Sequence, residues 1–125
     1  MDIAKNDVEK WLTFKKVNDK KREAFKVNID AIAESISEGI LILNEDFSFT
    51  HKLLFPIGEE AKVSELKYKA RLSVNELQNA LSGKSGMDAR ILATAAALSN
   101  QPKKVVESMD TEDYNVAGSI AVFFV

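Results

Sequence analysis

Apolar residues are spaced like one face of a helix between residues 20 and 38: Phe25, Ile29, Ile32, Ala33 and Ile36. This spacing, with charged residues on the other side, predicts an amphipathic helix over residues 20–38. Gly39 follows, and glycine often supplies the left-handed conformation that ends a helix. Residues 1–19 have a looser helical pattern, so we expect them to form a short, mobile amphipathic arm.

Short apolar runs replace the helical pattern after this helix. Residues 40–43 and residues 47–53 are rich in residue types that favour strands, and the polar sequence Asn44-Glu45-Asp46 separates them. Two such runs around a polar turn predict a β-hairpin. We expect Pro56 and Gly58 to end the second strand, because proline cannot donate a hydrogen bond to a neighbouring strand.

Strict alternation of apolar and charged residues marks the segment from Glu65 to Leu72. Its apolar members are Leu66, Tyr68, Ala70 and Leu72. One apolar face and one charged face predict a third strand, in an antiparallel sheet that helices cover on one side. A parallel sheet between helices would instead require strands that are apolar on both faces.

Helical patterns return after the third strand. Ser73 and Glu76 have the spacing of a capping box, which satisfies backbone N–H groups in the first turn of a helix. That helix is predicted to stop at Gly83 and to turn three apolar residues inward: Val74, Leu77 and Leu81. Asp88 is expected to cap the next helix, whose stripe over residues 91–98 is rich in alanine and would let a neighbour approach closely.

Two further helices are predicted near the end of the chain. Pro102 suits the first turn of a short helix with three apolar residues, Val105, Val106 and Met109. Asp110 or Thr111 is expected to cap a final helix that runs through Phe124. The whole order predicts an α+β fold: an N-terminal helix, a three-stranded antiparallel meander, and a C-terminal cluster of three or four helices packed on one face. We expect residues 1–125 to form a single domain.

Composition and charge exclude several classes of protein. The 125 residues include no cysteine, which excludes disulfides and thiolate metal sites. No apolar run reaches the ~20 residues of a membrane span, and the first residues do not resemble a secretion signal, so we expect a cytoplasmic protein. The net charge of −2 offers no general attraction for nucleic acid. Residues 1–26 carry eight basic and five acidic side chains, a mixture that favours a solvated helix face.

No set of residues matches a catalytic, cofactor-binding or metal-binding pattern. His51 is the only histidine, and it falls on the inward face of the second strand, where we expect a structural role. Three carboxylate pairs, Glu45-Asp46, Glu59-Glu60 and Glu112-Asp113, fall in turns or in a first helical turn, where they are expected to be solvated and ionised. The sequence Gly83-Lys84-Ser85-Gly86 lacks the spacing and the preceding strand of a phosphate-binding loop. We therefore expect no enzyme activity, no metal and no cofactor.

The chain ends in a segment, residues 119–125, that is apolar on all sides of the predicted helix. Chain ends are usually polar and frayed unless they are docked. This end is therefore expected either to be buried in the domain or to press against a partner, and the sequence leaves both open. The candidate partner-binding residues are Ile120, Phe123, Phe124 and Val125, and self-association into a homo-oligomer is expected if they are exposed.

Several short signatures between residues 40 and 125 occur together in one family of proteins. They are Leu53-Leu54-Phe55-Pro56-Ile57, Val63–Arg71 with the helix after Ser73, the alanine-rich Leu92–Leu98, Gln101–Val106, and Met109–Asp113 leading to Phe123-Phe124. With these signatures the chain resembles the tail assembly chaperones of tailed bacteriophages and prophages.

The resemblance implies a helper protein without catalytic residues. Such chaperones cover the tape measure protein, a long coiled-coil-rich chain that sets tail length, and help to recruit tail tube subunits around it. The resemblance thus implies the tape measure protein and the tail tube protein as partners, and action in the host cytoplasm rather than presence in the mature virion. In many of these phages a ribosomal frameshift extends some copies of the chaperone, and an apolar end such as residues 120–125 is compatible with that.

Two other classes of function remain open at this point. A small adaptor or regulatory module unrelated to phage tails would share the fold class, but it would have no affinity for a tape measure protein. An enzyme would require His51 and a nearby carboxylate in one pocket.

Overall fold

The computed structural model of the chain describes residues 2–83 and 86–125, and it describes Asp2 and Ala61 by their backbone alone. Lys84 and Ser85, which belong to the Gly-Lys-Ser segment of the sequence, lie outside the described residues.

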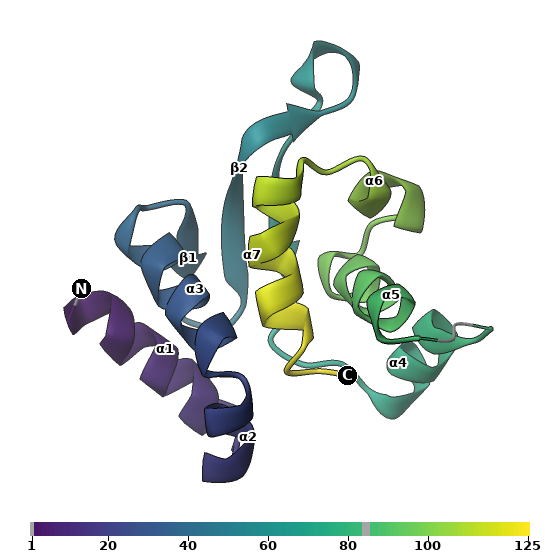
Figure 1. Ribbon diagram of the computed structural model, residues 1–125. Helices are drawn as coiled ribbons and strands as arrows, with labels where there is room; N and C mark the ends of the chain where they lie inside the picture. The colour runs from purple at the N-terminus through teal and green to yellow at the C-terminus, as the bar shows by residue number, and fades with distance from the viewer. Residues whose placement is uncertain (1, 84–85) are drawn as a thin grey trace.

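A three-stranded antiparallel sheet forms one layer of the protein (Figure 1). Its strands lie side by side in chain order: β1 (Leu41–Leu43), β2 (Phe49–Ile57) and β3 (Val63–Tyr68). Leu43 pairs with Phe49, and Phe49 pairs in turn with Tyr68. The sheet is therefore the meander that the sequence predicts.

Helices precede and follow the sheet along the chain (Figure 1). Those before β1 are α1 (Asp2–Phe14), α2 (Asp19–Ala24) and α3 (Lys26–Ser37). Those after β3 are α4 (Val74–Leu81), α5 (Met87–Ser99), α6 (Lys103–Glu107) and α7 (Thr111–Ala121). A short 3-10 turn, η1 (Glu59–Ala61), joins β2 to β3. This order confirms the predicted α+β class.

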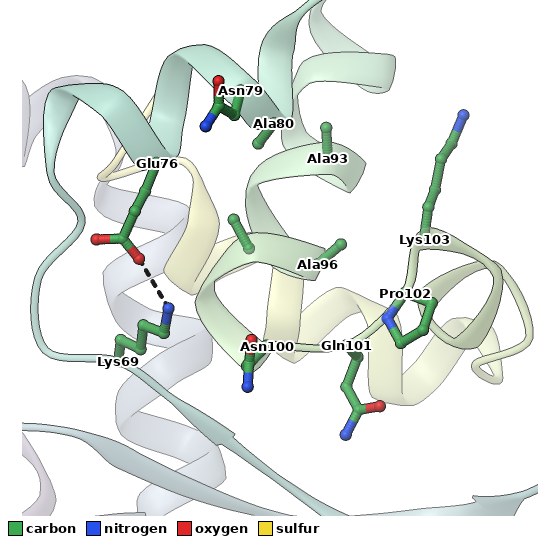
Figure 2. Close-up of a pocket in the computed structure, with 11 residues that line it drawn as sticks. Lys69, Glu76, Asn79, Ala80, Ala93, Ala96, Asn100, Gln101, Pro102 and Lys103 are labelled. Atoms are coloured by element: carbon green, nitrogen blue, oxygen red, sulfur yellow. Dashed lines mark hydrogen bonds and ion pairs between the residues drawn. The ribbon is translucent and has the colours of Figure 1, made fainter.

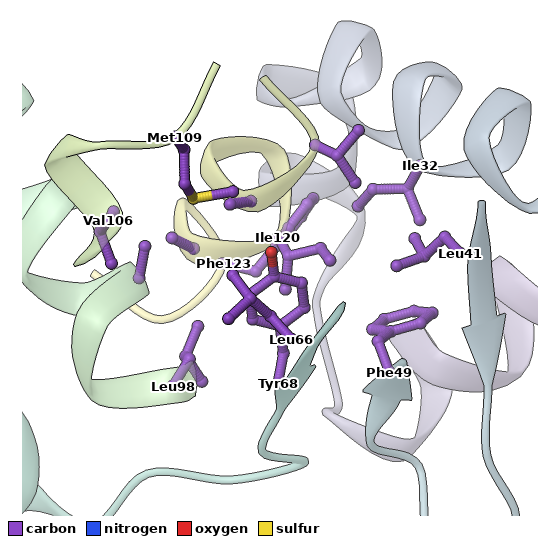
Figure 3. Close-up of a cluster of buried hydrophobic side chains, with 14 of the residues drawn as sticks. Ile32, Leu41, Phe49, Leu66, Tyr68, Leu98, Val106, Met109, Ile120 and Phe123 are labelled. Carbon is purple, nitrogen blue, oxygen red and sulfur yellow. The ribbon is translucent and has the colours of Figure 1, made fainter. Parts of the chain in front are cut away.

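The hydrophobic core lies between one face of the sheet and the helices (Figure 3). Buried side chains on that face come from alternate strand positions: Phe49, His51, Leu53, Leu66 and Tyr68. Lys52 and Lys67 point the other way and are exposed. Ile32 of α3, Leu98 of α5 and Ile120 of α7 close over the buried face. The alternation of apolar and charged residues therefore corresponds to one buried and one exposed face, as predicted for a sheet that helices cover on one side.

The first helix is part of the core and not a separate arm. Trp11 is 1% exposed, and its ring lies edge-on to Phe49 and Phe123, with centroids 5.2 and 5.5 Å away. Three more residues of α1 are buried: Ala4, Val8 and Leu12. The expectation of a mobile arm over residues 1–19 is corrected here, because the side chains that hold α1 come from distant parts of the sequence.

The helix predicted over residues 20–38 is two helices. The break falls at Phe25, whose backbone dihedrals (φ −112°, ψ 30°) leave the helical region. The Phe25 ring lies edge-on to Phe123 at 5.5 Å between centroids. The helix thus breaks where the Phe25 ring packs against Phe123. The amphipathic pattern continues through this point, so the sequence alone does not reveal the break.

The second strand begins later than predicted and includes one of the two residues expected to end it. It begins at Phe49, because Phe47 has a positive φ of 66° within the hairpin turn. It continues through Pro56 and ends at Ile57, so Gly58 follows its end as predicted and Pro56 does not. The pairing of β2 with β3 shifts register between Lys52 and Ile57, and a proline fits an irregular stretch of sheet that requires no donor from it.

The third strand is shorter than predicted, ending at Tyr68 instead of Leu72. The backbone N–H of Lys69 donates to the carbonyl of Leu98 in α5 at 2.9 Å, so the chain leaves the sheet at that point. Ala70 and Leu72 are half-buried outside the strand.

Two of the predicted helix caps are confirmed and one is wrong. The Ser73 hydroxyl accepts the Glu76 N–H and the Glu76 carboxylate accepts the Ser73 N–H, both at 3.1 Å, which confirms the capping box. Asp110 is the N-cap of α7, as one of the two alternatives proposed. Asp88 is not the cap of α5: the N-cap is Gly86, and Asp88 lies in the first turn.

Helix α4 is less buried than its pattern predicts. Val74, expected to face inward, is 73% exposed, while Leu77 and Leu81 are half-buried. The helix packs chiefly against α5 and lies at the edge of the molecule, so only one of its sides is covered.

Replacing Trp11 with alanine tests whether α1 belongs to the core. We expect the free energy of unfolding to fall by about 3–5 kcal/mol, the usual cost of truncating a buried Trp or Phe. Ile3→Ala in the same helix is the control, because Ile3 is 78% exposed and its truncation should change stability by less than about 0.5 kcal/mol. Urea denaturation monitored by circular dichroism measures both values, and similar values for the two variants would show that α1 is not docked.

Candidate functional site

The candidate partner-binding residues at the end of the chain lie largely inside the protein. Ile120 is 1% exposed and Phe123 is 3% exposed, so these two side chains are not available to a partner. Phe124 and Val125 are half-buried. Of the two alternatives for this end, burial in the domain is the one that the structure shows. The expected partner-binding role is corrected for Ile120 and Phe123 because both are buried, Phe123 against the rings of Trp11 and Phe25; for Phe124 and Val125 it stays a prediction.

Basic side chains of the first half of the chain hold this end in place. The Lys15 ammonium lies 3.4 Å from the centre of the Phe124 ring, a cation–π contact. Burial, with Lys21 and Arg71 nearby, lowers the pKa of Lys15 to about 8. The Lys21 ammonium donates to the carbonyl oxygen of Phe123 at 3.4 Å. Part of the basic segment therefore packs against the end of the chain.

His51 lies in a sealed polar cluster with Tyr68 and Asp113. The three residues are 0%, 1% and 0% exposed, respectively. Nδ1 of His51 lies 2.7 Å from the Tyr68 hydroxyl, while Nε2 makes no hydrogen bond and lies 3.7 Å from Oδ1 of Asp113. A neutral ring that accepts the Tyr68 O–H and turns its Nε2–H toward the carboxylate fits these contacts. Burial lowers the pKa of His51 to about 4, although the Asp113 charge acts in the opposite direction.

Asp113 uses its carboxylate to fasten α7 to β2. Oδ1 accepts the backbone N–H of Leu54 at 2.8 Å and Oδ2 accepts that of Phe55 at 2.9 Å. The prediction that the Glu112-Asp113 pair is solvated is wrong for Asp113, which is buried. Only the residue on the inner side of the first turn meets the irregular part of β2, where free N–H groups need an acceptor.

The cluster brings together a histidine and a carboxylate, but no substrate can reach them in this conformation. None of the three side chains is more than 1% exposed. The other carboxylate pairs, Glu45-Asp46 and Glu59-Glu60, are exposed as predicted. Among the described residues, no group of three or more histidine, aspartate or glutamate side chains is placed to hold a metal ion. The geometry of His51 is therefore that of a structural residue.

A groove runs across α5 (Figure 2). We call it the α5 groove; its volume is about 650 Å³. Its lining comes from α4, α5, the segment that joins α5 to α6, the start of α6 and the residue after β3: Lys69, Glu76, Asn79, Ala80, Ala93, Ala96, Ala97, Asn100, Gln101, Pro102 and Lys103. The groove therefore lies between three helices and not at the buried cluster.

Small side chains form the floor of the α5 groove and polar groups form its rim. Alanines of α4 and α5 leave the helix backbones close to the surface, while Asn79, Gln101 and Lys103 stand at the edges (Figure 2). Lys69 and Glu76 make an ion pair of 2.8 Å at one end. That hydrogen bond from Lys69, with those from Ser73, lowers the pKa of Glu76.

Sequence reasoning found part of this groove. The alanine run of α5 predicts close approach by a neighbour, and the structure leaves Ala97 and Ala80 half-buried beside open space. Asn79 carried no signal, and Gln101 entered only as the first residue of the Gln101–Val106 signature, because single amides in polar segments are common. Their role depends on how α4 and α6 flank α5, which the local pattern does not specify.

No helix among the described residues is both long enough and apolar enough to cross a membrane.

Comparison with known proteins identifies no relative of this chain. No family model matches it. No curated protein matches it, and no solved structure does.

Asp113→Ala should destabilise the protein strongly, because it removes the buried carboxylate that accepts the backbone N–H groups of Leu54 and Phe55. We expect a loss of about 3–5 kcal/mol in the free energy of unfolding. Glu112→Ala is a matched control one residue away, since Glu112 is exposed, and should change stability by less than about 0.5 kcal/mol. Equal effects of the two substitutions, measured by urea denaturation at pH 7, would contradict the role given to Asp113.

The lowered pKa of His51 predicts acid destabilisation. Because its folded pKa is about 4 against an ordinary value of 6.5, the unfolded chain binds the proton first as the pH falls. This contribution to stability is complete above pH 6.5 and is lost between pH 6.5 and about 4, a loss of about 3 kcal/mol.

The measurement is urea denaturation at several pH values for the natural protein and for His51→Gln. The glutamine amide can still bond the Tyr68 hydroxyl but does not titrate. The difference in stability between the two proteins should shrink as the pH falls from 7 to 4.5. A constant difference would show that His51 does not titrate in this way.

Proposed function

We propose that this protein is a non-enzymatic assembly chaperone of phage tail morphogenesis. It binds a helical segment of the tape measure protein in the α5 groove and helps to recruit tail tube subunits. The single observation that carries the proposal is the open groove with an alanine floor between α4 and α6.

The shape of the groove suits a helix better than a small molecule. Small-molecule sites usually enclose most of their ligand, whereas this groove is open along its length (Figure 2). Two helix axes approach to 8–10 Å when the side chains between them are small. Ala93, Ala96 and Ala97 provide small side chains on the floor of the groove. A partner helix can thus lay an apolar face on α5, a common mode of peptide recognition.

The polar rim gives such a partner a defined orientation. The amides of Asn79, Asn100 and Gln101 offer donors and acceptors at the edges, and Lys103 offers a positive charge. Polar groups around an apolar centre are the usual anatomy of a specific interface.

The groove also coincides with the segments that carry the resemblance to tail assembly chaperones. Lys69 belongs to the Val63–Arg71 signature, the alanines to Leu92–Leu98, and Pro102 to Gln101–Val106. Segments that are separate in the sequence therefore meet around one concave surface. This convergence supports the proposal that the surface has a function in common with those proteins, in the cytoplasm of the host cell.

Binding to the tape measure protein encoded in the same gene cluster tests the proposal. We expect co-expression to keep that long chain in solution and to yield a complex in size-exclusion chromatography. Asn79→Arg, which places a long charged side chain at the rim of the groove, should weaken the complex about tenfold.

Gln78→Arg is the matched control, because Gln78 is the neighbouring amide on α4, is equally exposed and does not line the groove. It should leave affinity unchanged. A protein that folds normally and does not bind the tape measure protein would refute the proposal. Capture of a different helical protein through the same groove would favour the small-adaptor alternative.

A further inference from the structure

A second surface of the protein exposes two adjacent large apolar side chains. Leu54 is 51% exposed and Phe55 is 55% exposed, although both belong to β2. They lie where the register of β2 with β3 shifts, between Lys52 and Ile57, and the hairpin extends beyond the helices at that end of the molecule (Figure 1).

The protein holds these two residues in place with a buried charge. The Asp113 carboxylate accepts the N–H groups of Leu54 and Phe55 at 2.8 and 2.9 Å, and Asp113 itself is 0% exposed. A backbone fixed in this way presents its side chains without further loss of conformational freedom when a partner binds.

A pocket of about 250 Å³ lies beside Leu54, between α3 and the start of α7. Its apolar lining includes Ala31, Ile40, Leu54 and Val116. This volume suits a single large apolar side chain. The pocket and the α5 groove have no lining residue in common, so this surface is separate from the one proposed above.

Carboxylates also line this pocket, and the positions of two of them, Glu34 and Glu38, are electrostatically unfavourable in the isolated protein. Glu34, Glu38 and Glu112 line it, are exposed, and make no ion pair with any residue that the structure describes. Glu34 and Glu38 are four residues apart, a spacing at which like charges repel on a helix. Glu38 is also the C-cap of α3, the end of a helix that disfavours an acid. A cationic partner would relieve both effects.

We propose that Leu54 and the pocket beside it form a docking surface for a partner protein segment in which an apolar side chain is flanked by lysine or arginine. The apolar side chain enters the pocket beside Leu54. Its basic neighbours pair with Glu34, Glu38 and Glu112. The unneutralised charge selects this occupant over a neutral apolar segment or an acidic one.

A defined peptide tests the surface directly. The probe is a fluorescein-labelled seven-residue peptide with a central leucine between pairs of lysines, and its match has glycine in place of the leucine. We expect the leucine peptide to bind about tenfold more tightly by fluorescence anisotropy. In nitrogen-15 NMR spectra, the leucine peptide should shift the amide signals of Leu54, Phe55 and Glu112 and leave those of the α5 groove unchanged.

Variants of the protein separate a built surface from general charge attraction. Glu34→Lys with Glu112→Lys should weaken binding of the leucine peptide about tenfold. The control with the same charge change, Glu65→Lys with Glu107→Lys, alters two exposed glutamates outside the pocket and should have little effect. Leu54→Ser should remove the preference for leucine over glycine.

Equal binding of the two peptides, or equal weakening by both pairs of charge changes, would overturn the proposal. So would a dimer in sedimentation analysis that Leu54→Ser dissociates, because the occupant would then be a second copy of this chain. Neither result bears on the α5 groove, which Asn79→Arg tests independently.

Discussion

The fold depends on one buried charge, the carboxylate of Asp113. A charged group inside a protein is costly unless every oxygen finds a donor. Here both oxygens accept backbone N–H groups of β2, where the irregular pairing with β3 leaves these groups without a strand partner. The irregular pairing between β2 and β3 therefore positions helix α7. The same contact brings the carboxylate to within 3.7 Å of Nε2 of His51, which explains why a histidine can be buried there without a hydrogen bond at that atom.

Aromatic packing connects the two ends of the chain across this arrangement. Phe123 follows α7, and its ring lies edge-on to Trp11 of α1 and to Phe25 at the junction of α2 and α3. Each such pair adds about 0.5–1.5 kcal/mol beyond its buried area. Fixing α7 on β2 therefore also fixes Phe123, and Phe123 in turn organises the helices before the sheet. Lys15 and Lys21 of the basic segment, residues 1–26, contribute to this packing, although the charge of that segment alone predicts a solvated face.

The features that the sequence predicted well are those whose causes are local. Alternation around Leu66 and Tyr68 specifies a strand with one buried face, and Ser73 with Glu76 specifies a helix start, because each pattern is complete within a few residues. Trp11 and Asp113 were misjudged for the opposite reason. Both lie on elements whose patterns allow either exposure or burial, and their partners, Phe123 and the amides of Leu54 and Phe55, are more than fifty positions away. The same distinction holds for the candidate site. The alanines of α5 form a local pattern that predicts close packing, whereas only the fold brings the flanking amides to the rim of the groove.

The two surfaces proposed as binding sites differ in chemistry, and this difference argues for two kinds of partner. The α5 groove has small side chains, amides and one matched ion pair, which suit the proposed recognition of a long helix by its shape. The surface at Leu54 has large side chains and unmatched carboxylates, which suit the proposed recognition by charge around a single apolar contact. Because α7 and the buried Asp113 hold the second surface while α5 forms the first, both surfaces rest on the same rigid core. A protein built in this way can hold an extended chain on one side and contact a different protein on the other without changing its own shape, as an assembly chaperone with two partners would require.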